Sequence, residues 1–358
     1  MDADGVVREV AEAVGLAEGE AGVRDVLRAV VRLEPASTRA VSRATALPVP
    51  IVAAIAGELR RRGVLAPERP ARLTAAARPL FSAARAAARP GDVMRLAELA
   101  AGAPAARSEL DQSHCTVATT VRRTLALDDA GALAGRRVLL LGDDDLLALA
   151  VARLAPAVGE LVVLDVDAAV LAYVARHAPG ARVVAHDLRG PLPRELAARF
   201  DTVFTDPPYT CAGAELFLSR AVEALVPEVG GQVFLAFPGK PPREALRLQG
   251  AITRMGLVIR SVARNFNEYA HASILGGRSH LYHLVSAGAA APLLPGRYDG
   301  PLYTGDGRPP RAYRCASCRS VHRVGRGAAW ATVAVLRTDG CPECGATRFL
   351  PLPRRTRA

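Results

Sequence analysis

From Gly135 onward the sequence alternates short apolar runs with amphipathic segments, and this alternation restricts the fold more than any other feature of the chain. We predict strands at residues 138–141, 161–164, 182–184, 203–205 and 232–237, and helices at 146–154, 168–177 and 214–225. Strands alternating with helices are typical of a parallel sheet. Apolar runs at 257–262 and 279–285 would complete a seven-stranded Rossmann-like sheet of the methyltransferase type, which binds ligands at the carboxyl ends of its strands.

Acidic residues follow four successive predicted strands. The first strand ends at Gly142-Asp143-Asp144-Asp145, and Asp165, Asp187 and Asp206 follow the next three. In such a sheet, a carboxylate after the second strand commonly binds ribose hydroxyls, and one after the third can accept from an adenine amino group. We predict these roles for Asp165 and Asp187. The alternative for either residue alone is a capping carboxylate at a helix start.

Three adjacent aspartates replace the glycine-rich turn that a methyltransferase normally has after its first strand. Like charges repel, and they raise one another's pKa unless a helix dipole, a metal ion or an organic cation compensates. The helix beginning at Leu146 would compensate only in part. The triplet therefore predicts a divalent metal or a polycationic substrate, with an elaborate helix cap as the alternative.

The motif Asp206-Pro207-Pro208-Tyr209 directly follows the predicted fourth strand. Displacement at a sulfonium centre needs a nitrogen whose lone pair is free, and a carboxylate held by a rigid Pro-Pro turn can orient such an amine and accept its proton. The motif therefore predicts transfer of an alkyl group to an amine. Taken alone it supports methylation equally well, and a plain surface turn is the alternative.

Four of the six cysteines form two C-x-x-C pairs, Cys315 with Cys318 and Cys341 with Cys344. Their spacing is typical of a zinc ribbon, so we predict that these four thiolates bind a structural zinc ion. A redox pair is the alternative, and His322 could replace one ligand.

Residues 20–80 show the pattern of three short helices and a wing that opens at Gly63, which indicates a winged helix-turn-helix. In isolation this fold suggests DNA binding, and the alternative is an accessory or dimerisation module. The net charge of +11 lies in the flanks, since residues 287–358 hold 12 arginines and 4 acidic residues. Lys240 is the only lysine, so part of this basicity reflects a general preference for arginine.

Together these motifs resemble the branched-chain polyamine synthases, also called N4-bis(aminopropyl)spermidine synthases. The resemblance covers about half of the chain, and the winged-helix domain of the family is similar to residues 20–80. It depends on five ordered segments: Asp111-Gln112 with Thr119-Thr120-Val121-Arg122-Arg123; Leu141-Gly142-Asp143-Asp144-Asp145; His186-Asp187-Leu188-Arg189 with Pro191-Leu192-Pro193; Asp206-Pro207-Pro208-Tyr209-Thr210; and Asn265-Phe266-Asn267-Glu268-Tyr269.

The resemblance implies transfer of an aminopropyl group from decarboxylated S-adenosylmethionine to the secondary amine of spermidine, with methylthioadenosine as by-product. Both substrates are cationic and favour a carboxylate-lined pocket. The implied catalytic residues are Asp143, Asp144, Asp145 and Asp206. Gly142, Asp165, Asp187 and Leu188 would bind the donor. Pro207, Tyr209, Asn267, Glu268, Tyr269, Asp111 and Gln112 would bind the acceptor, with residues 267–269 on a loop; for the last five residues, local loop hydrogen bonding is an equal alternative.

Two other functions stay open at this point: an S-adenosylmethionine-dependent N-methyltransferase acting on a nucleic-acid base, and a DNA-binding regulator that senses polyamines. We predict a winged-helix domain at 1–85, a helical linker at 86–109, the transferase domain at 110–286, a linker at 287–310, and a zinc ribbon with a basic tail at 311–358. We also expect a cytoplasmic homodimer with no membrane segment, in which nucleic acid could bind the winged helix, ribbon or tail.

Overall fold

The computed structural model describes residues 2–83, 85–270, 277–304, 310–325, 327–330 and 332–353. Its central layer is a seven-stranded sheet in the order β3-β2-β1-β4-β5-β7-β6. The strands are β1 (Arg137–Leu141), β2 (Glu160–Asp165), β3 (Arg182–Ala185), β4 (Thr202–Thr205), β5 (Gln232–Phe237), β6 (Leu257–Glu268) and β7 (Arg278–Ser286). The first five strands are parallel, whereas β7 runs antiparallel to both β5 and β6. The Rossmann-like prediction is confirmed at this level.

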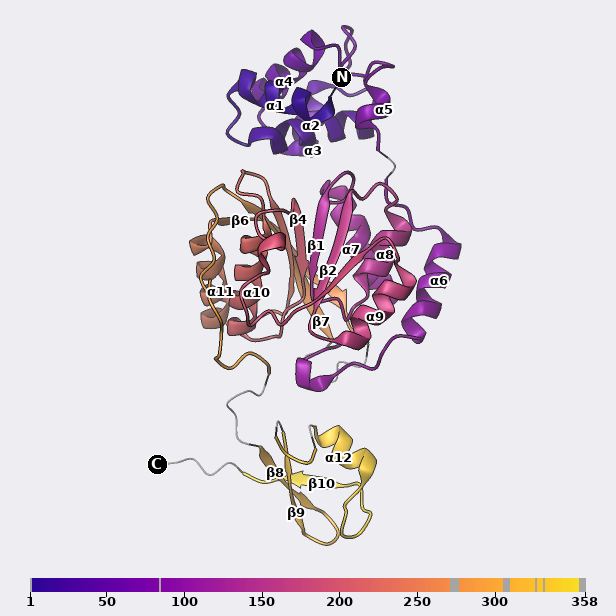
Figure 1. The fold of residues 1–358 in the computed structure, drawn as a ribbon, viewed down its shortest axis with the longest axis vertical. Coiled ribbons are helices and arrows are strands. Elements are labelled where there is room, and N and C mark those ends of the chain that lie inside the picture. The colour runs from indigo at the N-terminus through magenta and orange to yellow at the C-terminus, as the bar shows by residue number, and fades with distance from the viewer. Residues whose placement is uncertain are drawn as a thin grey trace.

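Helices cover both faces of the sheet (Figure 1). The helices on one face are α6 (Pro90–Ala101), α7 (Val117–Asp129), α8 (Leu147–Leu154) and α9 (Ala168–His177), and those on the other are α10 (Cys211–Ala224) and α11 (Pro242–Arg254). Along β1, Val138 and Leu140 pack into one core, while Leu139 and Leu141 pack into the other. Burial on both faces explains why these strands read as unbroken apolar runs.

The turn after β1 depends on backbone conformation. Gly142 has φ 77° and Leu146 has φ 55°, so the chain turns sharply before α8 begins at Leu147. Glycine adopts this left-handed region at little cost. The three aspartates therefore lie on the turn itself, and the helix starts one residue later than we predicted.

Strand β6 is longer than its apolar pattern predicted. It continues to Glu268, with register shifts relative to β7 between Ile259 and Ser261 and between Ala263 and Asn267. Asn267 pairs with Ser279 and Glu268 with Arg278. We predicted a loop for these residues, and that prediction is wrong because the polar end of the strand carries no apolar alternation from which it could be recognised.

The N-terminal part consists of α1 (Ala3–Val14), α2 (Gly19–Leu33), α3 (Thr38–Thr45), α4 (Val49–Arg61) and α5 (Arg78–Phe81) around its own apolar core. Isolated β-bridges join Leu65 to Leu73 and Ala36 to Ala71, in the region where we predicted a wing. No single helix of the described part is long and apolar enough to cross a bilayer; α3 and α4 reach that length and composition only as a pair bent by 114°.

The C-terminal part contains β8 (Arg311–Cys315), β9 (Val321–Val324), α12 (Val333–Asp339) and β10 (Phe349–Pro351), with the sheet order β10-β8-β9. The predicted basic tail falls on residues 354–358, outside the described residues. We predicted linkers at 86–109 and 287–310. In the structure Leu96 and Leu99 of α6 are buried in the main core, and residues 287–304 also run along the core.

Candidate active site

The four acidic positions meet at one edge of the sheet. Because β3, β2, β1 and β4 are parallel neighbours, the residues that follow them lie side by side at their carboxyl ends. A hydrogen bond connects two of these positions directly, because the Asp143 amide donates to Asp165 Oδ2 at 2.9 Å. The edge that the sequence predicted as the site is therefore continuous in space.

The three adjacent aspartates have different surroundings. Asp143 is 2% exposed, and its carboxylate accepts from the Ala148 amide in the first turn of α8. Asp145 is also buried, and it accepts from the Cys115 amide at 2.6 Å. Asp144 is only half-buried and accepts from the Ser113 amide at 3.0 Å. Asp144 is therefore the member of the triplet most accessible to a ligand.

The pKa values of the triplet differ accordingly. Burial raises the pKa of Asp143 well above the usual range. Burial and the charge of Asp145 do the same for the pKa of Asp144. Burial also opposes ionisation of Asp145, but the nearby Arg123 guanidinium outweighs that effect and lowers its pKa.

Arg123 on α7 is the cation that compensates the buried carboxylates. Its side chain is 0% exposed, with Nη1 2.5 Å from Asp145 Oδ2 and Nη2 2.7 Å from Asp206 Oδ2. The guanidinium also donates to Asn267 Oδ1 at 2.8 Å and lies over the Phe204 ring. From the sequence we predicted that a metal ion or a polycationic substrate compensates the negative charge of the aspartates. In the structure Arg123 compensates part of that charge.

Asp206 is the second carboxylate of this buried network. Its Oδ2 accepts from the Tyr269 hydroxyl at 2.6 Å as well as from Arg123. Burial, strengthened by the charge of Asp145 and opposed by Arg123, raises the pKa of Asp206 to about 7. Asp206 therefore changes charge close to neutral pH, which suits a group that accepts a proton.

The Pro207-Pro208 turn presents the Tyr209 ring beside the same network. This ring lies edge-on to Phe237 and to Tyr269, with centroids 6.1 and 6.0 Å away. Lys240, which follows β5, donates to the Tyr209 carbonyl oxygen at 2.6 Å. Contacts with Phe237 at the end of β5 and with Lys240 after it therefore hold Tyr209 in place.

The polar end of β6 contributes residues of two kinds. Asn267 is buried, and its amide nitrogen donates to Ser279 Oγ at 2.8 Å, while Tyr269 closes the network around Asp206. The Glu268 carboxylate instead pairs with Arg278 at 3.1 Å and is 40% exposed. The structure thus brings Asn267 and Tyr269 to the buried network of Arg123 and Asp206 and directs Glu268 toward a basic partner.

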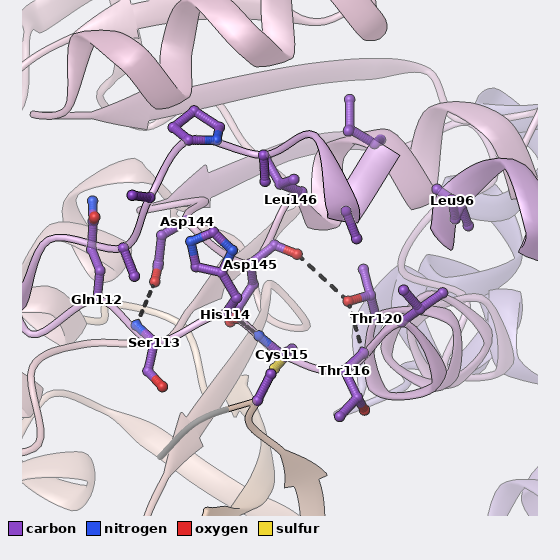
Figure 2. Close-up of a pocket in the computed structure, with 18 residues that line it drawn as sticks. Leu96, Gln112, Ser113, His114, Cys115, Thr116, Thr120, Asp144, Asp145 and Leu146 are labelled. Carbon is purple, nitrogen blue, oxygen red and sulfur yellow. Dashed lines mark hydrogen bonds between the residues drawn. The ribbon is translucent and has the colours of Figure 1, made fainter. Parts of the chain in front are cut away.

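A cavity of about 510 Å³ opens beside the triplet (Figure 2). Asp144, Asp145 and Gln112 form part of its polar wall together with the segment from Ser113 to Thr116. The apolar part of the lining includes Leu96, Ala100, Leu146 and Leu149. A ligand that combines an alkyl chain with a cationic group would match this mixed lining.

The residues predicted to bind the aminopropyl donor lie at the adjacent part of the sheet edge. Asp165 accepts from two main-chain amides, those of Asp143 and Asp167. Asp187 is exposed and accepts from the Arg189 amide, and the neighbouring Leu188 is buried. The two other predicted residues on this side are bonded to other segments: Gln112 donates to Asp167 Oδ2 at 3.1 Å, and Asp111 accepts from the Thr304 amide at 2.5 Å.

Three residues contribute to the site although the sequence analysis assigns them no role: Arg123, Lys240 and Asp167. The sequence did contain a signal for Arg123, because this residue belongs to the segment Thr119-Thr120-Val121-Arg122-Arg123 on which the family resemblance depends. Asp167 caps α9 by accepting from the Ala169 amide. This role could have been predicted, because aspartate directly before a helix is a preferred N-cap residue. The contact of Lys240 with Tyr209 joins residues 31 positions apart and leaves no pattern in the sequence.

The four paired cysteines converge at the C-terminal sheet. The Sγ atoms of Cys315, Cys318, Cys341 and Cys344 all lie within 4.8 Å of one another. Cys315 and Cys344 are 3.6 Å apart, and Cys318 and Cys341 are 3.5 Å apart. A tetrahedral site with Zn–S bonds of about 2.3 Å has edges of roughly 3.8 Å, so these residues fit a zinc ion. His322 Nε2 is 3.3 Å from Cys341 Sγ, beside the four thiols.

A second group close enough to bind a metal consists of Cys115, Asp145 and Asp206. The Arg123 guanidinium already forms ion pairs with both of these carboxylates. Of the two candidate groups found among the described residues, the cysteine cluster is therefore the better metal site.

Comparison with known proteins identifies several relatives. The family profile described as the branched-chain polyamine synthase A C-terminal domain matches residues 93–279. A protein of unknown function from Methanocaldococcus jannaschii is 33% identical over 98% of this chain and 93% of its own length. N(4)-bis(aminopropyl)spermidine synthases from M. jannaschii and Thermus thermophilus are 30% and 34% identical, and the chain spans about half of their length, 52% and 50%.

A solved structure extends the likeness to most of the chain. The branched-chain polyamine synthase of Thermus thermophilus, in complex with N4-aminopropylspermidine and 5'-methylthioadenosine, is 26% identical with a TM-score of 0.56. The match covers 84% of this chain and 98% of that one. The similarity therefore extends beyond the region matched by the family profile.

Proposed function

The chain belongs to the branched-chain polyamine synthase family, and on this premise we propose that it is an aminopropyltransferase. The proposed reaction transfers the aminopropyl group of decarboxylated S-adenosylmethionine to the internal secondary amine of spermidine or a similar linear polyamine. Its products are a branched polyamine and methylthioadenosine. The ligands in the related Thermus structure, N4-aminopropylspermidine and 5'-methylthioadenosine, support this assignment.

The observation that carries the proposal is the position of Asp144 between the buried network and the cavity. Its carboxylate is half-buried, lines the cavity and has the Ser113 amide as a hydrogen-bond donor. An ammonium group of the acceptor would supply positive charge beside Asp144. A polyanionic acceptor such as nucleic acid would be repelled there.

In the proposed reaction the secondary amine attacks the methylene carbon bonded to the sulfonium. A C–N bond forms while the C–S bond breaks, and the sulfonium takes the bonding pair and leaves as the neutral thioether methylthioadenosine. The amine must lose one proton in the process. Asp144 and Asp206 are the groups to which we assign orientation of the amine and acceptance of that proton.

Several of the other predicted residues have supporting roles in this proposal. Asp143 shapes the turn before α8, and Asp145 holds Arg123 in place for Asp206. Gly142, Asp165, Asp187 and Leu188 would bind the nucleoside of the donor. Tyr209 and Tyr269 would border the acceptor, whose apolar chain the cavity would enclose.

We further propose that the four C-terminal cysteines bind a structural zinc ion, which would join the strands and loops of a small module. The assignment of the N-terminal helices as a winged helix, and the formation of a homodimer, stay predictions.

The function is tested by mass spectrometry of the products formed from spermidine and decarboxylated S-adenosylmethionine. We expect methylthioadenosine together with a branched polyamine one aminopropyl group heavier than spermidine. Asp144→Asn and Asp206→Asn should each lower kcat/KM by about 10²- to 10⁴-fold, the usual contribution of a positioned proton acceptor. Asp4→Asn, which changes an exposed aspartate paired with Arg24, is the matched control and should keep wild-type activity. Methyl transfer from ordinary S-adenosylmethionine, without aminopropyl transfer, would overturn the proposal.

A further inference from the structure

The chain does not leave the core after β7 but runs back across it. Residues 294–304, which we call the strap, are fastened first by Arg220 on α10, whose side chain is fully buried. The Arg220 guanidinium donates to the carbonyl oxygens of Leu294 and Gly296, both at 2.7 Å, and to that of Leu188 at 2.9 Å. One arginine therefore ties the beginning of the strap to the loop after β3.

The end of the strap reaches two of the motifs that define the site. Thr210, at the end of the Asp206–Thr210 motif, donates through Oγ1 to the Leu302 carbonyl oxygen at 2.7 Å. The Thr304 amide donates to Asp111 Oδ2 at 2.5 Å. Leu302 itself is buried. Residues 302–304 thus bridge the turn after β4 and the segment that precedes α7.

Tyr303 lies between these two attachments. The Arg189 guanidinium is placed over its ring, with Cζ 5.6 Å from the centroid. Asp111, which accepts from the next residue of the strap, is followed by Gln112. The Gln112 side chain donates to Oδ2 of Asp167, which follows β2, at 3.1 Å. Tyr303 therefore lies beside the loop after β3, next to a segment that contacts the loop after β2.

This is the part of the sheet edge at which a nucleoside binds in Rossmann-like folds. We propose that the strap completes the donor site, with Tyr303 as a donor-binding residue whose ring packs against the purine base of decarboxylated S-adenosylmethionine and of methylthioadenosine. The inference rests on the proposed function. It adds a residue from outside the predicted transferase domain and outside residues 93–279, which match the family profile.

The contacts around Tyr303 restrict the conformation of its ring. Arg189 packs over the Tyr303 ring, and the hydrogen bonds at Leu302 and Thr304 hold the main chain on either side of it. An aromatic side chain held in this way loses little conformational freedom when a base stacks on it. Stacking of a base on an aromatic ring contributes about 5- to 150-fold in affinity.

Isothermal titration of the full-length protein with methylthioadenosine tests the inference. Tyr303→Ala should weaken binding by about 5- to 150-fold, whereas Tyr303→Phe should bind within about threefold of wild type, since the ring is kept. In steady-state kinetics Tyr303→Ala should raise KM for the donor and leave KM for spermidine unchanged. Binding of methylthioadenosine should also slow hydrogen exchange at the amides of residues 302–304.

Tyr298→Ala is the matched control, because Tyr298 is a tyrosine of the same strap whose hydroxyl bonds to Pro301 within it. Equal losses in Tyr298→Ala and Tyr303→Ala would show that strap order, not contact with the base, is responsible, and would overturn the inference. Wild-type affinity in Tyr303→Ala would overturn it as well. Absence of methylthioadenosine binding in the wild type would instead contradict the proposed function, so the two failures are distinguishable.

Discussion

Single residues in this protein acquire their chemistry from their neighbours more than from their type. Asp144 and Asp145 are adjacent in sequence, yet the pKa of one is raised and that of the other is lowered, because Arg123 contacts only the second. Asp206 lies between these extremes. The Tyr269 hydroxyl and Arg123 both lower its pKa and partly offset the effect of burial, which leaves it near neutral pH.

This balance predicts the pH dependence of the reaction. Asp206 must be ionised to accept a proton, so kcat/KM for spermidine should rise as the pH increases through about 7. Tyr269→Phe removes the hydrogen bond that favours the carboxylate, and the acidic limb should therefore move to higher pH. The acceptor amine titrates identically in both proteins, so the shift between their pH profiles isolates Asp206. Superimposable acidic limbs would contradict the assignment.

The same ionisation has the opposite effect on stability. The folded-state pKa of Asp206, about 7, lies above the ordinary value of 3.8. The contribution of Asp206 to the free energy of unfolding is therefore fully present below pH 3.8 and is lost as the pH rises through 7. Above pH 7, where the ionised Asp206 can accept a proton in the proposed reaction, it therefore contributes least to the free energy of unfolding.

At the scale of elements, α7 acts as the support of the site. Thr116 caps this helix by accepting from the Thr119 amide, and Arg123 extends from its buried face to the edge of the sheet. Its guanidinium reaches the turn after β1, the turn after β4 and the end of β6. One helix therefore holds together three segments that the topology only brings near one another.

Arg123→Met should destabilise the protein strongly, because it leaves Asp145 and Asp206 buried without their counter-charge. Loss of one partner of a buried ion pair costs about 3–5 kcal/mol. Arg122→Met is the control on the same helix; Arg122 is exposed and donates to the Phe266 carbonyl oxygen, so the cost should be about 1 kcal/mol or less. Urea unfolding measures both values at one pH, and equal losses would contradict the role given to Arg123.

For the whole molecule, the central sheet carries the proposed chemistry, and smaller parts lie at either end of the chain (Figure 1). Ion pairs join the N-terminal helices to the core, such as Arg32 with Asp129 and Arg260 with Asp25. The C-terminal module has a much smaller core, centred on Cys315, Val324, Leu336, Cys341 and Phe349. A core of this size needs a further source of stability, and a metal would supply it.

We therefore expect the purified protein to contain one zinc ion per chain, measured by inductively coupled plasma mass spectrometry. Removal by a chelator, or Cys341→Ser, should unfold residues 311–353 and expose them to limited proteolysis, while the core stays resistant. Cys211→Ser, in a half-buried cysteine outside the cluster, should keep the metal. Protein that contains no metal and still resists proteolysis in this region would contradict the zinc assignment.

The sequence by itself determined the architecture of the central domain. Strand β5 and helix α9 have the predicted bounds, and the acidic positions meet at one edge, because parallel strands with both faces buried leave strong apolar runs and end at a common edge. The likeness of five ordered motifs to a known family indicated the proposed reaction, and the matched family profile confirms that likeness.

Only the tertiary structure decided which side chains contact one another and how the pKa values of the carboxylates differ. The pairing of Arg123 with two of the carboxylates, the contact of Lys240 with Tyr209, the length of β6 and the course of the strap all join residues far apart in the chain. Such contacts follow no local period, so no window of sequence records them. They depend instead on desolvation and on distances of a few ångströms, which exist only once the chain has folded.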